Sequence, residues 1–175
     1  MEENLKKAIE GATVVMMCGV SGSGKTTMAH RMEADGWRRL SADIDVWNRF
    51  GGEYASMPAD SQRQIYMEAM NSMLERIPEY VKSGERVVID SSMCKRTKRD
   101  AVRHMCDSLG VKCALIYTSA SREELLRRLS SRHGQGPDDQ IVSEAELDRF
   151  ICNFEAPEPD EHFIHIANSS AVTKA

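Results

Sequence analysis

A short stretch near the N-terminus constrains the fold more than any other part of the sequence. An apolar segment at residues 13–18 (TVVMMC) leads directly into residues 19–26, GVSGSGKT, which match the spacing Gly-x-x-x-x-Gly-Lys-Ser/Thr. The glycines leave the backbone N–H groups of such a loop open to a phosphate group, and they allow the positive φ angles that turn these groups inward. The stretch therefore predicts a buried strand, a phosphate-binding loop and the N-terminus of a helix.

The residues of this loop are expected to bind ATP and Mg²⁺, which are the cofactors that the motif implies. Lys25 would reach the β- and γ-phosphates as a point charge, and the hydroxyl of Thr26 would bind Mg²⁺. The other residues expected to contact the nucleotide are Gly19, Ser21, Gly22, Ser23, Gly24 and Thr27. A phosphate loop indicates a nucleotide but identifies no reaction.

Apolar runs and helical patterns alternate along the rest of the chain, as they do in a parallel α/β sheet. Strands are expected near residues 13–18, 37–41, 86–90, 111–118 and 162–167. Helical periodicity covers residues 60–77, 97–109, 121–132 and 143–154. Pro78 should bend or end the first of these helices, and the last two open with Ser-x-x-Glu capping boxes. The pattern predicts a three-layer α/β/α sandwich with five parallel strands, folded as one domain over residues 1–175.

Carboxylates follow the ends of two expected strands. Asp90 closes the apolar run RVVID, where a carboxylate would contact Mg²⁺ or its water shell. Asp43 follows another strand in RRLSADID, and in a parallel sheet it would lie at the same carboxyl edge as the phosphate loop. There it could accept the proton of an attacking hydroxyl as a general base. Asp45 is the second candidate for this role, and capping of the next helix is the alternative for either aspartate.

Two arginines on the expected helix 121–132 complete the candidate catalytic residues. Arg128 and Arg132 are four residues apart on one flank of its apolar side, whereas Arg127 projects away. Arg132 stands at the entrance of a polar segment rich in glycine and proline, which predicts a mobile lid near residues 128–142. An arginine on a closing lid can neutralise charge on a transferred phosphoryl group. A solvated helix surface is the alternative.

Composition narrows the class of protein. The chain is 41% hydrophobic and 29% charged with a net charge of −4, which suits a cytoplasmic enzyme or binding domain. The five cysteines form no Cys-x-x-Cys pair, and Cys18 and Cys113 fall in apolar runs. Reduced core thiols are therefore expected rather than disulfides or zinc ligands. No apolar run approaches the ~20 residues of a membrane span, and the first residues lack the apolar centre of a secretion signal.

Several stretches together resemble the P-loop kinases that include the 5′-hydroxyl kinase domain of bacteriophage polynucleotide kinase and, more distantly, the zeta-toxin-type kinases. The resemblance spans roughly residues 13–165 and rests on GVSGSGKTT, LSAD, VVIDSS, RRLSSR and NFEAPEPDE, in that order. It implies the strand order 2-3-1-4-5 and ATP-dependent phosphorylation of a hydroxyl group. It also implies that Asp43 is the base, that Arg132 is the lid arginine, and that the segment after Phe154 lies near the adenine.

The sequence defines the phosphoryl acceptor less well. Polynucleotide-type members carry an arginine three residues after the base, where this chain has Val46, with Arg49 as the nearest candidate. The glycine-flexible segment 50–61 would form part of the acceptor pocket. A helix flank with a row of arginines could hold an anionic acceptor or a nucleic-acid backbone, or it could face solvent. These arginines are Arg96, Arg99 and Arg103.

We therefore expect a phosphotransferase that moves the γ-phosphate of Mg·ATP to a hydroxyl of a small molecule, or of a nucleoside or sugar derivative. The acidic net charge, Val46 and the lack of stacked aromatic residues near a basic groove favour this acceptor class over nucleic acid. Two alternatives stay open: a 5′-hydroxyl polynucleotide kinase and a non-catalytic ATP-binding sensor. The sequence predicts no membrane partner and indicates no oligomeric state.

Overall fold

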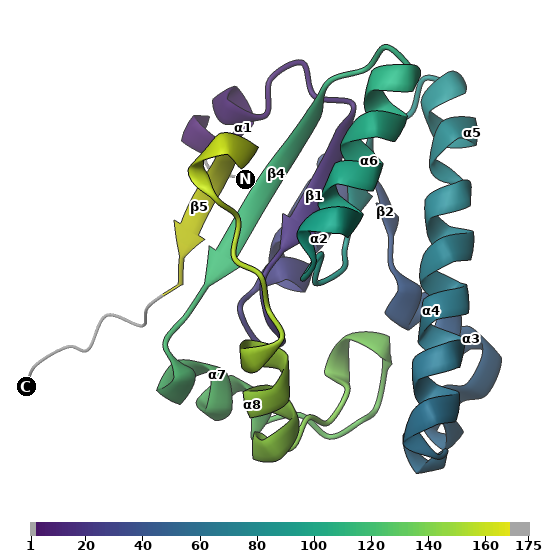
Figure 1. Ribbon diagram of the computed structural model, residues 1–175, viewed down its shortest axis with the longest axis vertical. Coiled ribbons are helices and arrows are strands. Elements are labelled where there is room, and N and C mark those ends of the chain that lie inside the picture. Colours follow the sequence, from purple (N-terminus) through teal and green to yellow (C-terminus); the bar gives the residue numbers. More distant parts are fainter. Residues whose placement is uncertain (1–2, 169–175) are drawn as a thin grey trace, which may run out of the picture.

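A five-stranded sheet forms the centre of the molecule in a computed structural model that describes residues 3–168 (Figure 1). Its strands are β1 (Val14–Cys18), β2 (Arg38–Leu40), β3 (Val87–Ile89), β4 (Cys113–Ser119) and β5 (Phe163–Ala167). They lie in the order β2-β3-β1-β4-β5, and every neighbouring pair is parallel. This arrangement confirms the predicted fold class and strand order.

Helices connect the successive strands. They are α1 (Glu3–Ala8), α2 (Lys25–Ala34), α3 (Ala42–Phe50), α4 (Ala59–Glu75), α5 (Ile77–Lys82), α6 (Arg96–Ser108), α7 (Arg122–Leu129) and α8 (Glu144–Cys152). The short 3-10 helices are η1 (Gly51–Ser56), η2 (Pro137–Asp139) and η3 (Pro159–Glu161). Pro78 lies in the first turn of α5, so it separates α4 from α5 as predicted. Between residues 3 and 168, no helix is both long enough and apolar enough to cross a membrane.

Alternate residues of β1 face opposite sides of the sheet. Val14, Met16 and Cys18 belong to a buried cluster with residues of α3, α4, α5 and α6. Val15 and Met17 belong to a second cluster with residues of α1 and α2. The whole strand is buried because helices cover both faces of the sheet (Figure 1). The molecule therefore has three layers, and the phosphate loop follows the central strand at the carboxyl edge.

Helices α7 and α8 form a smaller unit beyond this edge. Leu129 of α7 and Leu147 of α8 lie in one apolar cluster, with Val20 of the phosphate loop packed against it. The N-cap serine of each helix accepts a hydrogen bond from the backbone N–H three residues on, as the capping boxes predict. The α7–α8 connection, residues 130–142, contains η2 and reaches across to α3 (Figure 1). It is thereby held near the ends of the strands.

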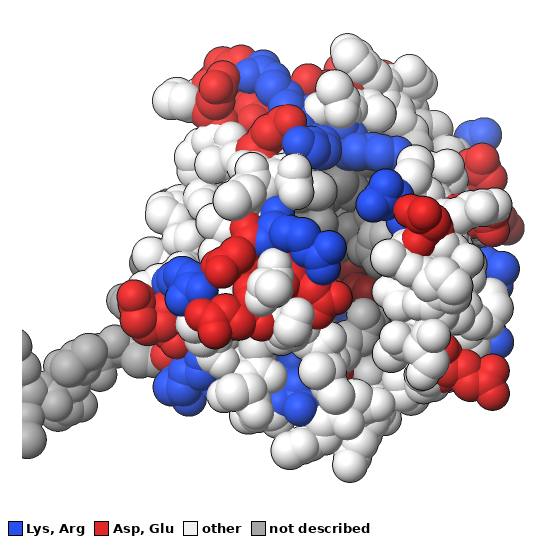
Figure 2. Space-filling view, turned by 60° about the horizontal axis from the view of Figure 1, so that its bottom comes forward, with Lys and Arg blue, Asp and Glu red and all other residues white. Residues whose placement is uncertain are grey.

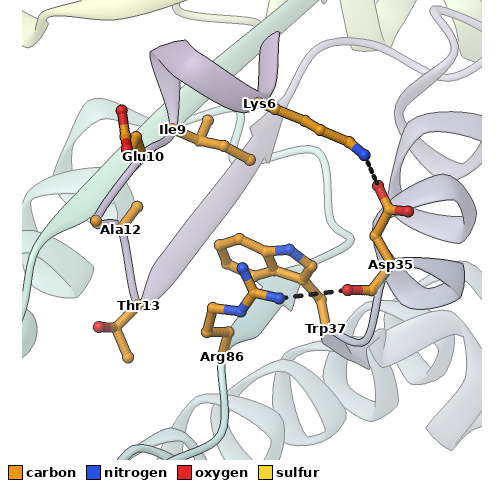
Figure 3. Close-up of a pocket in the computed structure, with 9 residues that line it drawn as sticks. Lys6, Ile9, Glu10, Ala12, Thr13, Asp35, Trp37 and Arg86 are labelled. Atoms are coloured by element: carbon orange, nitrogen blue, oxygen red, sulfur yellow. Dashed lines mark hydrogen bonds and ion pairs between the residues drawn. The ribbon is translucent and has the colours of Figure 1, made fainter. Parts of the chain in front are cut away.

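A cavity of about 540 Å³ lies at the opposite, amino edge of the sheet (Figure 3). The Arg86 guanidinium stacks on the indole of Trp37, 4.7 Å from the ring centroid. Lys6 of α1 forms an ion pair of 3.6 Å with Asp35 at the end of α2. The Lys6–Asp35 ion pair joins α1 to the end of α2. Because the phosphate loop lies at the other end of β1, this cavity is no part of the candidate site.

The arginine flank of α6 is occupied by ion pairs within the molecule. Arg99 is fully buried and binds both carboxylate oxygens of Glu161, each at 2.7 Å. Arg103 donates to the same carboxylate at 3.0 Å, and Arg96 pairs with Asp160. The flank is thus packed against η3. Arg99 therefore faces neither solvent nor an acceptor, whereas the side chains of Arg96 and Arg103 stay 39% and 25% exposed beside their ion-pair partners.

Replacing Glu161 with alanine is expected to lower the free energy of unfolding by about 3–5 kcal/mol, because the buried Arg99 charge loses its partner. The Arg122–Asp148 pair offers a matched control: it is also bidentate, at 2.9 and 3.0 Å, but 48% of the Asp148 side chain is exposed. Asp148→Ala should cost far less stability, because an exposed ion pair contributes little. Urea unfolding of the two variants at neutral pH measures the difference, and equal losses would contradict a stabilising role for burial of the Arg99 pair.

The stabilising contribution of the Arg99–Glu161 pair should depend on pH. Hydrogen bonds from Arg99 lower the pKa of Glu161 to about 2. A depressed carboxyl pKa contributes stability that is fully present above the ordinary carboxyl value and is lost as the pH falls through the folded value. The stabilising contribution of Glu161 should therefore persist through mildly acidic pH and disappear toward pH 2.

Candidate active site

The phosphate loop has the backbone conformation that its glycines predict. Gly19, Gly22 and Gly24 have positive φ angles of 144°, 82° and 104°. Space is also limited, because a Cβ atom on Gly19 would lie 2.3 Å from the carbonyl oxygen of Thr118 in β4. The buried Ser23 hydroxyl forms a hydrogen bond of 2.8 Å with the Thr118 hydroxyl. The loop is clamped to β4, and the glycine N-cap of α2 has no side chain to cover the first N–H groups of the helix.

Lys25 lies across this loop. Its ammonium group donates a hydrogen bond of 2.9 Å to the carbonyl oxygen of Val20. Burial lowers the pKa of Lys25, and the nearby charges of Asp90 and Asp43 act in the opposite direction. The phosphate loop and both strand-end carboxylates are therefore within electrostatic reach of one cation.

Thr26 and Asp90 lie together beside the loop. The Thr26 hydroxyl donates to one carboxylate oxygen of Asp90 at 3.2 Å. A hydroxyl and a carboxylate are the oxygen ligands that Mg²⁺ prefers, and this ion takes most of its remaining ligands from phosphates and water. Between residues 3 and 168 no cluster of three or more His, Cys, Asp and Glu side chains could hold a metal ion. A site completed by phosphate oxygens needs no such cluster, so the residues present fit Mg²⁺ bound with a nucleotide.

Arg39 of β2 is a site residue that sequence patterns did not predict. Its side chain is 3% exposed, and its Nε donates to the second carboxylate oxygen of Asp90 at 2.8 Å. The guanidinium also contacts Asp138 in the α7–α8 connection. A strand arginine gives no local signal of such a role. The position of Arg39 emerges only when β2 pairs in register with β3, the strand that Asp90 follows.

Asp43 lies in the first turn of α3, directly after β2. The side-chain amide of Gln140, from the α7–α8 connection, donates to its carboxylate at 3.0 Å. Burial and then the Asp90 charge raise the pKa of Asp43 to about 6, against the opposing effects of Lys25 and the Gln140 hydrogen bond. A carboxyl group with a pKa near the working pH is well suited to accept a proton.

Asp45 has different surroundings. It is ion-paired with Arg76, which lies between α4 and α5, and both residues line a separate cavity of about 310 Å³ between α3 and α4. The fold therefore brings Asp43 close to Lys25 and engages Asp45 elsewhere. The assignment of Asp43 rather than Asp45 as the base stays a prediction.

Arg128 lies on α7, but Arg132 lies in the α7–α8 connection, because the helix ends at Leu129 and not at residue 132 as predicted. Arg128 donates to the Gly22 carbonyl oxygen at 3.1 Å and to a glutamate of its own helix at 2.6 Å. Arg132 donates to the backbone carbonyl of Gln140 at 3.2 Å. Arg127 points away as predicted, with 67% of its side chain exposed. Arg128 and Arg132 thus reach different parts of the same site.

The face of the molecule that carries this site is hollowed, with Lys, Arg, Asp and Glu side chains around the hollow (Figure 2). Of the remaining predicted loop residues, Ser21 is partly exposed and Thr27 is exposed on α2. The Ser23 hydroxyl is turned toward β4, so only the backbone of this residue can contact a ligand. The loop would therefore bind phosphate mainly through backbone N–H groups.

Two tyrosines, Tyr54 and Tyr66, lie on the side of the site where the acceptor is expected. The 3-10 helix η1, within the segment 50–61, is held by a hydrogen bond of 2.9 Å from the Tyr54 hydroxyl to the Gln62 carbonyl. Tyr66 of α4, predicted from the sequence only as part of an apolar helix face, lies close enough to Asp43 for its charge, after burial, to raise the pKa of the phenol. Helical periodicity alone could not distinguish it from a core residue.

Position 46, where polynucleotide-type kinases carry an arginine, is filled by core packing. Val46 is buried in the cluster between the sheet and α4. The next cation on α3, Arg49, is exposed and lies over the ring of Phe50 at 5.0 Å from its centroid. Val46 therefore stabilises the core and offers no charge to an acceptor.

Comparison with known proteins agrees with this geometry. The sequence model of the family AAA_33, described as an AAA domain, matches residues 14–157. The chain belongs to this family. The AAA_33 match includes the phosphate loop, both strand-end carboxylates and the whole α7–α8 connection.

Proteins similar to this AAA_33 chain include kinases. A protein of Aeropyrum pernix named probable adenylyl-sulfate kinase is 29% identical over 126 residues, covering 70% of this chain and 67% of that protein. A sugar kinase structure from Janibacter sp. is 27% identical with a TM-score of 0.62, covering 89% of this chain and 85% of the other. A gluconokinase structure from Sinorhizobium meliloti shares the fold at 23% identity and a TM-score of 0.60, covering 90% and 82% of the two chains. These similarities confirm the expected P-loop kinase family, whereas the finer likeness to polynucleotide kinases stays a prediction.

Proposed function

We propose that this protein transfers the γ-phosphate of ATP to a hydroxyl group of a small molecule. The observation that carries the proposal is the environment of Asp43, a carboxyl with a pKa of about 6 within electrostatic reach of Lys25. A phosphate loop alone serves many reactions. A base beside it suits phosphoryl transfer to a hydroxyl, in which the acceptor must lose a proton.

In this mechanism Asp43 accepts the proton of the attacking hydroxyl. Lys25 and Arg132 neutralise negative charge on the phosphate oxygens, where charge stabilisation is worth most in a water-poor site. Thr26 and Asp90 would hold Mg²⁺, which when bound orients the phosphates and offsets their charge. Binding and positioning by these side chains would supply most of the catalysis.

We infer that the α7–α8 connection is a mobile lid on a single domain. Arg132 and Gln140 support this role, because both belong to the connection and Gln140 is hydrogen-bonded to the proposed base. Arg128, bound to the Gly22 carbonyl oxygen, would support the phosphate loop from the same side. The lid would open to admit ATP and acceptor and close to exclude water. The segment after Phe154 would lie near the adenine.

A small hydroxylated acceptor is favoured over a polynucleotide for two reasons. The similar proteins of known name act, by those names, on adenylyl sulfate and on a sugar. The arginine flank of α6, which was the candidate track for a nucleic-acid backbone, is ion-paired with residues near η3. A 5′-hydroxyl polynucleotide kinase is the second candidate, and a non-catalytic ATP sensor is the third. A cytoplasmic location remains part of the proposal.

A screen with ATP labelled at the γ-phosphate tests the acceptor class. The panel contains sugars, polyols, sugar acids, adenylyl sulfate, nucleosides and 5′-hydroxyl oligonucleotides. We expect label to reach a small molecule, with a rate that changes little as salt is raised. Efficient labelling of oligonucleotides, with a log–log salt slope of about −0.7 per phosphate contact, would instead support the polynucleotide kinase. Tight ATP binding with no acceptor labelled would support the sensor.

A further inference from the structure

Asp138, in the α7–α8 connection, is held by residues of two other elements. Arg39 of β2 donates to one carboxylate oxygen at 2.5 Å, and a ring nitrogen of His30 in α2 shares a hydrogen bond of 2.8 Å with the other. The Arg39 guanidinium also lies 3.2 Å from the same ring nitrogen. Both oxygens of Asp138 are therefore engaged by groups outside the connection.

The neighbouring Asp139 has a different role. Its carboxylate accepts hydrogen bonds from the backbone N–H groups of His133 and Gln135, both at 3.1 Å and both within the connection. Asp139 thus shapes the turn, whereas Asp138 attaches it to the rest of the molecule. Because Gln140 is hydrogen-bonded to Asp43, attachment at Asp138 also holds the connection over the proposed base.

Besides Asp138, Arg39 also contacts Asp90, which lies beside the proposed Mg²⁺ position. The Nε of the same guanidinium donates to one oxygen of Asp90, and the other oxygen accepts from Thr26. The side chains of Arg39 and Asp90 are each 3% exposed, so salt and water screen their attraction weakly. Arg39 therefore lies between two carboxylates, one beside the proposed Mg²⁺ position and one on the α7–α8 connection.

We propose that Arg39 is a positioning residue that orients Asp90 for Mg²⁺ and latches the α7–α8 connection over the site through Asp138. This inference rests on the proposed function for its metal half, whereas the latch itself does not. Because one guanidinium serves both carboxylates, the two contacts are coupled, and the coupling is reciprocal. When Asp90 shares its charge with a cation beside Thr26, Arg39 is drawn more strongly to Asp138. Metal binding and closure of the connection thus favour each other.

Hydrogen–deuterium exchange of the backbone amides of residues 133–142, without nucleotide, tests the latch. Asp138→Asn should speed this exchange about tenfold, as loss of a charged hydrogen bond predicts. The Asp138 side chain is 33% exposed, so the substitution should leave the fold intact. Asp160→Asn, which removes an exposed carboxylate paired with Arg96, is the matched control and should change nothing. Wild-type exchange in Asp138→Asn would overturn the latch.

The affinity for ADP with and without Mg²⁺, measured by calorimetry, tests the positioning role. Arg39→Met keeps the length of the side chain and removes its charge. Mg²⁺ strengthens ADP binding by some factor in the wild-type protein, and this factor should be about tenfold smaller in Arg39→Met. Arg39→Lys should recover part of that factor, and Asp138→Asn should reduce it less than Arg39→Met does. An unchanged factor in Arg39→Met would refute the positioning role.

If metal binding and closure of the α7–α8 connection are coupled, hydrogen–deuterium exchange should also respond to bound Mg²⁺ and ADP. Mg²⁺ with ADP should slow exchange of residues 133–142 beyond ADP alone in the wild-type protein, and this difference should vanish in Arg39→Met. A difference that persists in the variant would refute the coupling. If the wild-type protein bound no Mg·ADP, the proposed function would fail, and exchange without nucleotide would still decide the latch.

Discussion

Lys25→Ala is expected to lower the rate of phosphoryl transfer by about 10²–10³-fold or more, the cost of removing a preorganised charge from a transition state. The ammonium group lies over the phosphate loop and donates a hydrogen bond of 2.9 Å to the Val20 carbonyl oxygen, so it is placed to move onto a phosphate oxygen. Burial already lowers its pKa. Because the Lys25 ammonium group is already removed from water, its binding to a phosphate would cost little further loss of hydration. Initial rates of ADP formation with the acceptor found by the screen measure the effect.

Lys82→Ala is the control for this substitution. Lys82 is an exposed residue of the last turn of α5, and its loss should change neither rate nor stability. Thermal unfolding of Lys25→Ala should show a stability close to that of the wild type, because an unfavourably buried cation has been removed. Near wild-type turnover in a folded Lys25→Ala protein would exclude the phosphate loop as the catalytic site.

The sequence predicted the fold well because its signals are local. An apolar run bounded by a glycine-rich loop marks β1, Pro78 marks the break between α4 and α5, and the capping serines mark the starts of α7 and α8. The strand order came from a family resemblance, since periodicity says nothing about which strands are neighbours. The phosphate loop was equally visible, because its glycine spacing is set by backbone geometry.

The tertiary partners of the arginines could not be predicted in this way. A row of arginines on α6 has the spacing of a solvated helix surface, and the acidic residues that bind it lie in and near η3, far along the chain. Arg39 is one of two consecutive arginines in β2, and nothing in the sequence shows that it is buried while Arg38 is exposed. Ion pairs between distant segments follow from the packing of the sheet, which a local pattern does not contain.

Asp43→Asn is expected to lower the rate of transfer by ~10²–10⁴-fold while ATP affinity stays within a few-fold, because asparagine keeps the shape of the side chain and cannot accept the proton. Asp45→Asn is the matched control, since Asp45 is ion-paired with Arg76 at a separate cavity. It should retain most of the activity. A large loss in Asp45→Asn together with an active Asp43→Asn would reverse the assignment of the base.

The pH dependence of the wild-type enzyme provides an independent check on Asp43. A general base must be ionised, so the rate should rise as the pH increases through about 6, the raised pKa of this carboxyl, and level off above it. The sign for stability is opposite. A carboxyl whose folded pKa is raised from 3.8 to about 6 binds its proton more tightly in the folded protein, so stability falls as the pH rises between these values.

Asp43→Asn removes that ionisation and should be at least as stable as the wild type at neutral pH, which separates loss of catalysis from loss of fold. Urea unfolding of both proteins at pH values on either side of the raised pKa measures this difference. The variant should also lose the rise in rate near pH 6 from its residual activity, because no group with that pKa remains at the base position. A variant that kept the same pH profile at a reduced rate would show that another group accepts the proton, and Asp43 would then be a residue that positions the lid through Gln140.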